Sequence, residues 1–241
     1  MAVSDDTDEL VMMTYVEGNG TCAGWAGYNG SNFVTQGKIG AFNLSTNQWT
    51  FSDSPNEMQW PAAEYDPVSK KIIIVGLDGL EIYDPVTKVK TLAIDFSRMY
   101  IPDDQGNLLS FGIFRYNNNL VYFPPNQKMY YFDRFDHRVI EITLDRSNFG
   151  NSQVVALTTA GTPSGHPEPG YAYDASNQII GGAVYQNKFY AFNPVTKSWT
   201  AQDILGGAPG NQAFHAIGYD DANNVFVFIT EDRQTWAYRY N

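Results

Sequence analysis

The sequence predicts an all-β fold built from a repeated unit of four short strands. Three observations support this prediction. The ten residues AFNLSTNQWT at 41–50 return as AFNPVTKSWT at 191–200. Charged residues make up only 17% of the 241 residues, which is too few for many long amphipathic helices, whereas aromatic residues make up 15%. The 21 glycines and the recurring Asp-Pro and Asn-Pro pairs are typical of a chain with many turns.

Two short signals recur in a fixed order along the chain. An aromatic residue on an expected third strand occurs five times, at Phe42, Tyr83, Phe132, Phe192 and Tyr238. A tyrosine followed by Asn or Asp precedes each of them, at Tyr28, Tyr65, Tyr116, Tyr173 and Tyr219. The unit repeats about every 48 residues, which is the length of a propeller blade. The sequence therefore predicts a five-bladed β-propeller with four-stranded antiparallel blades, in a single domain over 1–241.

The expected blades cover 20–54, 60–96, 109–144, 168–203 and 213–241. In the second of them, four strand-like runs are interrupted by turns that begin at Asp66-Pro67 and Asp84-Pro85. The Asp side chain caps the amides of such a turn, and the proline presets φ at the next position. Asn117–Asn119 is expected to form the corresponding first turn of the third blade without proline.

The last blade requires a fourth strand, because the sequence stops just after its third. The segment 9–17 is strand-like and lies before the first repeat. We expect Leu10–Val16 to be the outer strand of the last blade and to close the ring, since a propeller leaves no free sheet edge. The alternative makes this segment the inner strand of the first blade, with Tyr15 as its tyrosine signal.

The stretches FHAIGYDDANNVFVF at 214–228 and YAFNPVTKSWT at 190–200 resemble the kelch and galactose-oxidase-type β-propellers. The resemblance implies blades with an inner strand, an apolar second strand that often carries Gly-Gly, and then an aromatic residue and a tryptophan. Only the fourth blade has the Gly-Gly pair, and Lys90 and Val139 stand near where Trp49 and Trp199 stand. No Tyr-Cys-His copper set maps onto this sequence. The resemblance therefore implies a fold and, as the commonest role of kelch repeats, protein interaction.

Composition narrows the classes of partner and compartment. The net charge of −11 argues against nucleic acid and anionic membranes as partners, and no apolar run reaches 18 residues. The single cysteine, Cys22, excludes an intrachain disulfide. The polar start MAVSDDTDEL predicts no signal peptide, and a secreted or periplasmic protein whose leader has been removed is favoured over a cytoplasmic one. We expect a monomer.

Strand order assigns the connections between second and third strands, and between one blade and the next, to one face of the disc. These connections vary in length, and such loops on a rigid scaffold are where binding sites usually lie. Alternation along the inner strands assigns Glu64 and Arg115 to the central channel, where a structural ion pair is the alternative to a ligand contact. His166 and His215 precede inner strands on the same face, close to Glu168 and Trp60. The expected binding residues are Trp60, Glu64, Tyr100, Arg115, His166, Glu168 and His215.

The leading functional prediction is a binding module for a carbohydrate or an extended peptide on this face. The first alternative is a carbohydrate-active lyase or hydrolase with its site at the channel mouth, for which Glu57, Asp103 and Asp104 are further possible carboxylates. The second alternative is a protein-interaction platform. The histidines show no short metal-ligand spacing, so we expect neither a metal nor a cofactor.

Overall fold

The computed structural model describes residues 2–4, 6–15, 37–53, 62–76, 79–96, 100–110, 119–133, 138–163, 170–207, 216–230 and 233–240. The chain divides into two compact units, and each is described by itself. The first comprises 1–99, 112–114 and 146–150, and the second comprises 100–111, 115–145 and 151–241. Over the described residues the fold class is an all-β five-bladed β-propeller.

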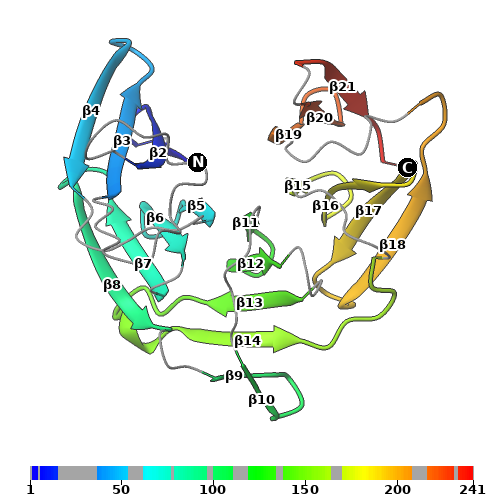
Figure 1. The fold of residues 1–241 in the computed structure, drawn as a ribbon, viewed down its shortest axis with the longest axis horizontal. Coiled ribbons are helices and arrows are strands. Elements are labelled where there is room, and N and C mark those ends of the chain that lie inside the picture. Colours follow the sequence, from blue (N-terminus) through cyan, green and yellow to red (C-terminus); the bar gives the residue numbers. More distant parts are fainter. Residues whose placement is uncertain are drawn as a thin grey trace, which may run out of the picture. The chain divides into compact units, whose positions relative to one another are not determined.

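Each blade is an antiparallel sheet whose strands follow chain order (Figure 1). The first unit holds β1 (Ala2–Ser4), β2 (Glu9–Tyr15), β3 (Gly37–Asn43) and β4 (Gln48–Asp53), then β5 (Ala62–Asp66), β6 (Lys71–Val75), β7 (Gly79–Asp84) and β8 (Val89–Asp95). The second unit begins with a two-stranded sheet of β9 (Tyr100–Pro102) and β10 (Leu108–Ser110). Its third blade is β11 (Asn119–Phe123), β12 (Lys128–Phe132), β13 (Val139–Thr143) and β14 (Gln153–Leu157).

The remaining blades also belong to the second unit. The fourth is β15 (Ala172–Asp174), β16 (Ile179–Tyr185), β17 (Lys188–Asn193) and β18 (Ser198–Asp203). The fifth has three strands among the described residues, β19 (Ala216–Asp220), β20 (Val225–Ile229) and β21 (Thr235–Tyr238). The described helical structure is one 3-10 turn, Phe149–Asn151.

The turns form as the sequence predicts. The Asp66 carboxylate accepts a hydrogen bond from the Ser69 amide at 3.2 Å, and the Asp84 carboxylate accepts one from the Val86 amide at 2.9 Å. The last residue of each turn has a left-handed backbone, with φ of 59° at Lys70 and 60° at Lys88. These local contacts explain why Asp or Asn so often opens a turn in this chain.

Two of the recurring aromatic residues, Tyr83 and Phe192, show how neighbouring sheets pack within each unit. In the first unit, Tyr83 is buried with Val11 and Ile39 of the first sheet. In the second unit, Phe192 of the fourth sheet packs with Phe132 of the third, and their ring centroids are 6.0 Å apart. Burial of these large rings supplies much of the apolar area that stabilises each pair of sheets.

The predicted closing strand is wrong, because the N-terminal segment pairs inside the first blade. β2 pairs with β3 along its whole length, from Glu9 opposite Asn43 to Tyr15 opposite Gly37, and β1 pairs with its other edge. It is therefore the second strand of the first blade, neither the outer strand of the last blade nor an inner strand. The reason is the turn between β1 and β2, where Asp8 has a φ of 53° like the last residue of the other turns.

The third blade lies later in the chain than 109–144, the range that the sequence predicts. Asn119 belongs to strand β11 and not to the expected turn at 117–119, whose other two residues lie outside the described part of the chain. The turn between the first and second strands of this blade is formed by 124–127. Phe132 consequently ends the second strand, β12. The fourth strand, β14, lies beyond residue 144, where the predicted blade ends.

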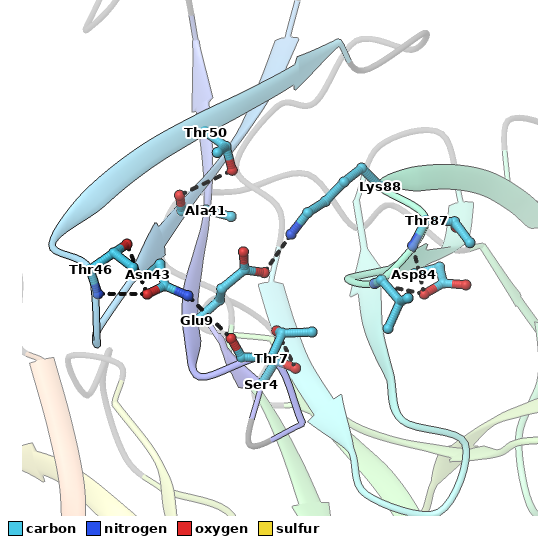
Figure 2. A network of polar contacts seen from close by, with 11 residues as sticks. Ser4, Thr7, Glu9, Ala41, Asn43, Thr46, Thr50, Asp84, Thr87 and Lys88 are labelled. Carbon is cyan, nitrogen blue, oxygen red and sulfur yellow. Dashed lines mark hydrogen bonds and ion pairs between the residues drawn. The ribbon is translucent and has the colours of Figure 1, made fainter.

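Within the first unit, polar contacts join the first two sheets to each other and the second sheet to Arg146. The Lys88 ammonium binds the Glu9 carboxylate, and the two side chains converge in Figure 2. The fully buried Asp66 carboxylate accepts two hydrogen bonds from Arg146, at 2.8 Å from Nε and 3.0 Å from Nη2. These contacts link segments about 80 residues apart in sequence, and a bidentate Arg–carboxylate pair fixes both position and orientation.

Candidate functional site

Two of the seven predicted site residues fall within the described part of the chain. They are Glu64 on β5 and Tyr100 on β9. Trp60, Arg115, His166, Glu168 and His215 lie outside the described residues. Glu64 belongs to the first unit and Tyr100 to the second, so each is considered in its own surroundings.

Residues 100–110 form a β-hairpin that displays Tyr100. Tyr100 is opposite Ser110, and Pro102 is opposite Leu108, so Tyr100, Pro102 and Leu108 share one face of the β9–β10 sheet. Tyr100 is 62% exposed and Leu108 is 69% exposed. Ile101 points to the other face and is 1% exposed, which anchors the hairpin on the protein. We call the surface of Tyr100, Pro102 and Leu108 the hairpin face.

The tip of the hairpin is fixed by Asp103. Its Oδ1 accepts hydrogen bonds from the backbone amides of Gln105 at 2.9 Å and Asn107 at 2.7 Å. Its Oδ2 accepts a third from the Asn107 side-chain amide at 2.9 Å. These donors lower the pKa of Asp103, with the Asn107 side chain the largest cause. These three hydrogen bonds stabilise the conformation of the loop.

Asp104 ties the same hairpin to the third and fourth blades of the second unit. Its backbone amide donates to the Ala156 carbonyl at 3.0 Å, next to a parallel bridge between Asp103 and Ala156. Its carboxylate accepts hydrogen bonds from the Thr158 amide at 2.9 Å and from Lys197 Nζ at 2.7 Å. Burial opposes ionisation, but these donors outweigh it and lower the pKa of Asp104 to about 2.

The electrostatics of this loop bear on catalysis. Asp103 and Asp104 were possible carboxylates for a hydrolase, and both have lowered pKa values. A general acid in glycoside hydrolysis needs a raised pKa so that it is protonated near neutral pH. The two carboxylates are ionised at neutral pH and already hold backbone and lysine donors, so they suit a structural role.

Among the described carboxyl groups, Glu64 has the raised pKa that a general acid or base needs. Its neighbours Ala63 and Tyr65 face the buried cluster with the first sheet, so alternation puts Glu64 on the opposite face of β5. Burial raises the pKa of Glu64 to about 7, against a hydrogen bond from the Tyr65 backbone that lowers it. A half-buried carboxyl that titrates near neutral pH is a candidate for a functional group.

The sequence predicts Tyr100 as a binding residue but does not single out its neighbours on the hairpin face. Pro102 and Leu108 join it because β9 and β10 pair in this register. The signal was available in part, since DDQGN at 103–107 reads as a turn between two short apolar runs. The described residues contain no group of three or more His, Cys, Asp and Glu side chains arranged to hold a metal. No helix in this part of the chain is long and apolar enough to cross a bilayer.

Comparisons with known proteins relate the chain to others by fold. No protein-family model matches the sequence, and no curated protein matches it. A structural genomics protein of unknown function from Bacteroides thetaiotaomicron is similar with a TM-score of 0.60 and 11% identity, over 97% of this chain and 56% of that one. A chain in the nidogen/laminin complex is similar with a TM-score of 0.50 and 11% identity, over 99% of this chain and 78% of that one.

The two solved structures are propeller-like, and at this identity they show the fold alone. This chain spans little more than half the length of the Bacteroides protein.

Proposed function

We propose that this chain is a ligand-binding β-propeller module that recognises a carbohydrate or an extended peptide, with the hairpin face as part of its binding surface. The observation that carries the proposal is the exposure of Tyr100 and Leu108 on a hairpin whose other side is buried and hydrogen-bonded. A ligand that covers exposed apolar side chains on a rigid support lowers the free energy of the complex, because apolar area is removed from water.

The chemistry of the face fits these two ligand classes. An exposed tyrosine ring stacks on the apolar face of a sugar and offers a hydroxyl at its rim. Pro102 and Leu108 add a flat apolar strip, which equally suits the side chains of an extended peptide. Small-ligand sites combine such apolar contacts with a few oriented polar groups, and the tip between β9 and β10 supplies exposed Gln105.

The other predicted binding residues, Trp60, Arg115, His166, Glu168 and His215, lie outside the described part of the chain. They remain part of the proposal and are the residues to test next by single substitution.

The test is binding to a glycan array and to a library of extended peptides, with matched variants. Tyr100→Ala and Leu108→Ser are each expected to weaken a hit at least about tenfold, since each removes a contact worth more than about 1.4 kcal/mol. The control is Leu205→Ser, because Leu205 is also an exposed leucine, at 91%. Hits that bind Tyr100→Ala and Leu108→Ser as tightly as the parent would remove the hairpin face from the proposal.

One observation favours a carbohydrate-active lyase or hydrolase as the second candidate. Glu64 lies on an inner strand and its pKa is raised to about 7, which is the range of a general acid. In that case Glu64→Gln abolishes turnover on a panel of polysaccharides while its melting temperature stays at or above that of the parent. Turnover that survives the substitution removes Glu64 from any catalytic role.

A protein-interaction platform is the third candidate. The kelch resemblance of the blade sequences supports it, and so does a fold similar to a chain in a complex between two proteins, nidogen and laminin. This candidate predicts a folded protein partner with no glycan or short-peptide binding. A Tyr100→Ala variant that loses such a partner would assign the hairpin face to that protein instead.

A further inference from the structure

β4 is the outermost strand of the first sheet, and its outer edge has no pairing strand among the described residues. It pairs with β3 in continuous register from Asn43 opposite Gln48 to Lys38 opposite Asp53, so it has no bulge. Trp49 and Phe51 are 45% and 59% exposed on it. Natural proteins usually protect such an edge with lysine, proline or a bulge, because unpaired backbone groups there bind another strand.

The fourth blade contains a second copy of this hairpin. Phe42 is opposite Trp49 in β3–β4, and Phe192 is opposite Trp199 in β17–β18. A smaller contact also repeats: the Thr50 hydroxyl donates to the Ala41 carbonyl at 3.4 Å, as Figure 2 shows, and Thr200 does so to the Ala191 carbonyl at 3.4 Å. The edge of β18 is therefore a guide to what the edge of β4 is built to hold.

The edge of β18 carries a short parallel segment. Ala160 forms a parallel bridge with Ser198. The Ala160 amide donates to the Lys197 carbonyl at 3.1 Å, and the Trp199 amide donates to the Ala160 carbonyl at 2.8 Å. β14 also carries a parallel bridge on its outer edge, between Ala156 and Asp103 at the tip of the β9–β10 hairpin. Single parallel bridges on outer edges thus occur twice among the described residues of the second unit.

The corresponding groups of the first blade are the Asn47 carbonyl and the Trp49 amide. Within the described residues neither has the backbone partner that its counterpart has on β18. The ring of Trp49 is 45% exposed, whereas the ring of Trp199 packs against Phe132 and Tyr171 and is 6% exposed. The rings of Trp49 and Phe51 are nearly parallel, at 12° and 5.9 Å between centroids. They rest on Gly40, where a Cβ atom would lie 3.1 Å from Phe51 and 3.2 Å from Trp49.

We propose that the β4 edge binds an extended segment of a partner protein, which pairs with it in parallel and lays its apolar side chains over Trp49 and Phe51. This site uses other residues than the hairpin face and goes beyond the proposed function. Main-chain hydrogen bonds supply affinity in this mode of recognition, and side-chain pockets supply specificity.

The β18 copy also specifies which peptide fits. The residue after Ala160 is Gly161, whose φ is 71° and whose added Cβ would lie 2.8 Å from the Trp199 carbonyl oxygen. A side chain at that position would collide with backbone, which cannot move aside. The recognised segment therefore has a small residue followed by glycine opposite the position of Trp49.

The probe is a labelled peptide, LTTAGTP, that copies residues 157–163, and the measurement is its fluorescence anisotropy with the full chain. We expect saturable binding with a Kd below about 1 mM. A peptide N-methylated at its alanine lacks the donor for the Asn47 carbonyl and is expected to bind at least about tenfold more weakly. A peptide with valine in place of glycine is expected to lose binding as well. No saturation, or equal binding of the modified peptides, overturns the proposal.

Two proline variants locate the site on the protein. Phe51 is two residues from Trp49, so its amide also points to the free edge, and Phe51→Pro blocks the edge without removing a bond to β3. The control is Ala201→Pro, the equivalent position of β18. We expect Phe51→Pro to abolish peptide binding and Ala201→Pro to leave it unchanged. Loss in the control alone would mean that the peptide displaces 157–163 from β18, and would overturn the proposal, as would retention in Phe51→Pro.

Discussion

The buried ion pair of the second blade allows a quantitative test of how much one side-chain pair contributes to the free energy of unfolding. Lys90 is opposite Tyr83 and occupies the position that tryptophan holds in the first and fourth blades. Its Nζ lies 2.6 Å from Glu81 Oε1, and the two side chains are 1% and 3% exposed. Where the first and fourth blades have an aromatic pair, the second blade therefore has a buried ion pair.

The perturbation is Lys90→Met, which keeps the length of the side chain and removes its charge. Glu81 then keeps its buried charge without this partner, and breaking such a pair costs about 3 to 5 kcal/mol of the free energy of unfolding. In a chain of this size about 1 kcal/mol shifts the melting temperature by roughly 2 to 4 °C, so the expected fall is roughly 6 to 20 °C. Removing both charges in Lys90→Met with Glu81→Leu should recover most of the loss.

The assay is urea and thermal unfolding of the parent, the two single variants and the double variant, followed by far-UV circular dichroism. The coupling energy from this cycle isolates the pair from the separate effects of each substitution. A loss below about 1 kcal/mol in Lys90→Met, or a double variant as unstable as that single variant, would show that the pair is not buried as described.

Three further predictions concern Glu64, Trp199 and Asp104. The pKa of Glu64 is raised from 4.5 to about 7, so the folded chain binds more protons than the unfolded chain between these values. Its stabilising effect is complete below pH 4.5 and is lost as the pH rises through 7, so Glu64→Gln should melt above the parent at pH 8 but not at pH 5; equal differences at both pH values would contradict this. Trp199→Ala should cost about 3 to 5 kcal/mol, whereas Trp49→Ala should cost less than about 1.5 kcal/mol, because only the first ring is buried; matched unfolding midpoints would contradict this. Asp104→Asn removes the ion pair with Lys197 and should speed proteolysis within 100–110, with Lys197→Met giving the same fragments; an unchanged digestion pattern would show that Asp104 does not hold the hairpin.

Short-range chemistry made much of the fold predictable. Asp66 and Asp84 open turns because each carboxylate reaches amides two or three residues away, and that contact needs no other part of the chain. The aromatic positions could be read for a similar reason, since one repeat predicts the environment of the next. Tyr83 and Phe192 accordingly lie in the cores between sheets.

The errors concern pairing partners. The segment 9–17 reads as a strand in any context, and its hydrophobic pattern fits the first blade as well as the last. Its partner is β3, because the turn that ends at Asp8 returns the chain beside β1 and leaves β2 free to pair with β3. In the third blade, the Pro-Pro turn after Phe123 competed with the Asn-rich stretch at 117–119, and the strand register follows the former.

The candidate site was also predictable from the sequence only in part. The sequence placed Tyr100 in a variable connection, but the pairing of β9 with β10 decides that it shares a face with Pro102 and Leu108.

By itself, the sequence determined an all-β repeat, the places of most strands and turns, and the class of connection that carries exposed residues. The tertiary structure alone decided which strands pair, which aromatic rings are covered, and which carboxylates bind lysine or arginine. The physical reason is range: a turn depends on atoms a few residues apart, whereas pairing, burial and pKa depend on segments up to about 90 residues apart, such as Asp104 and Lys197.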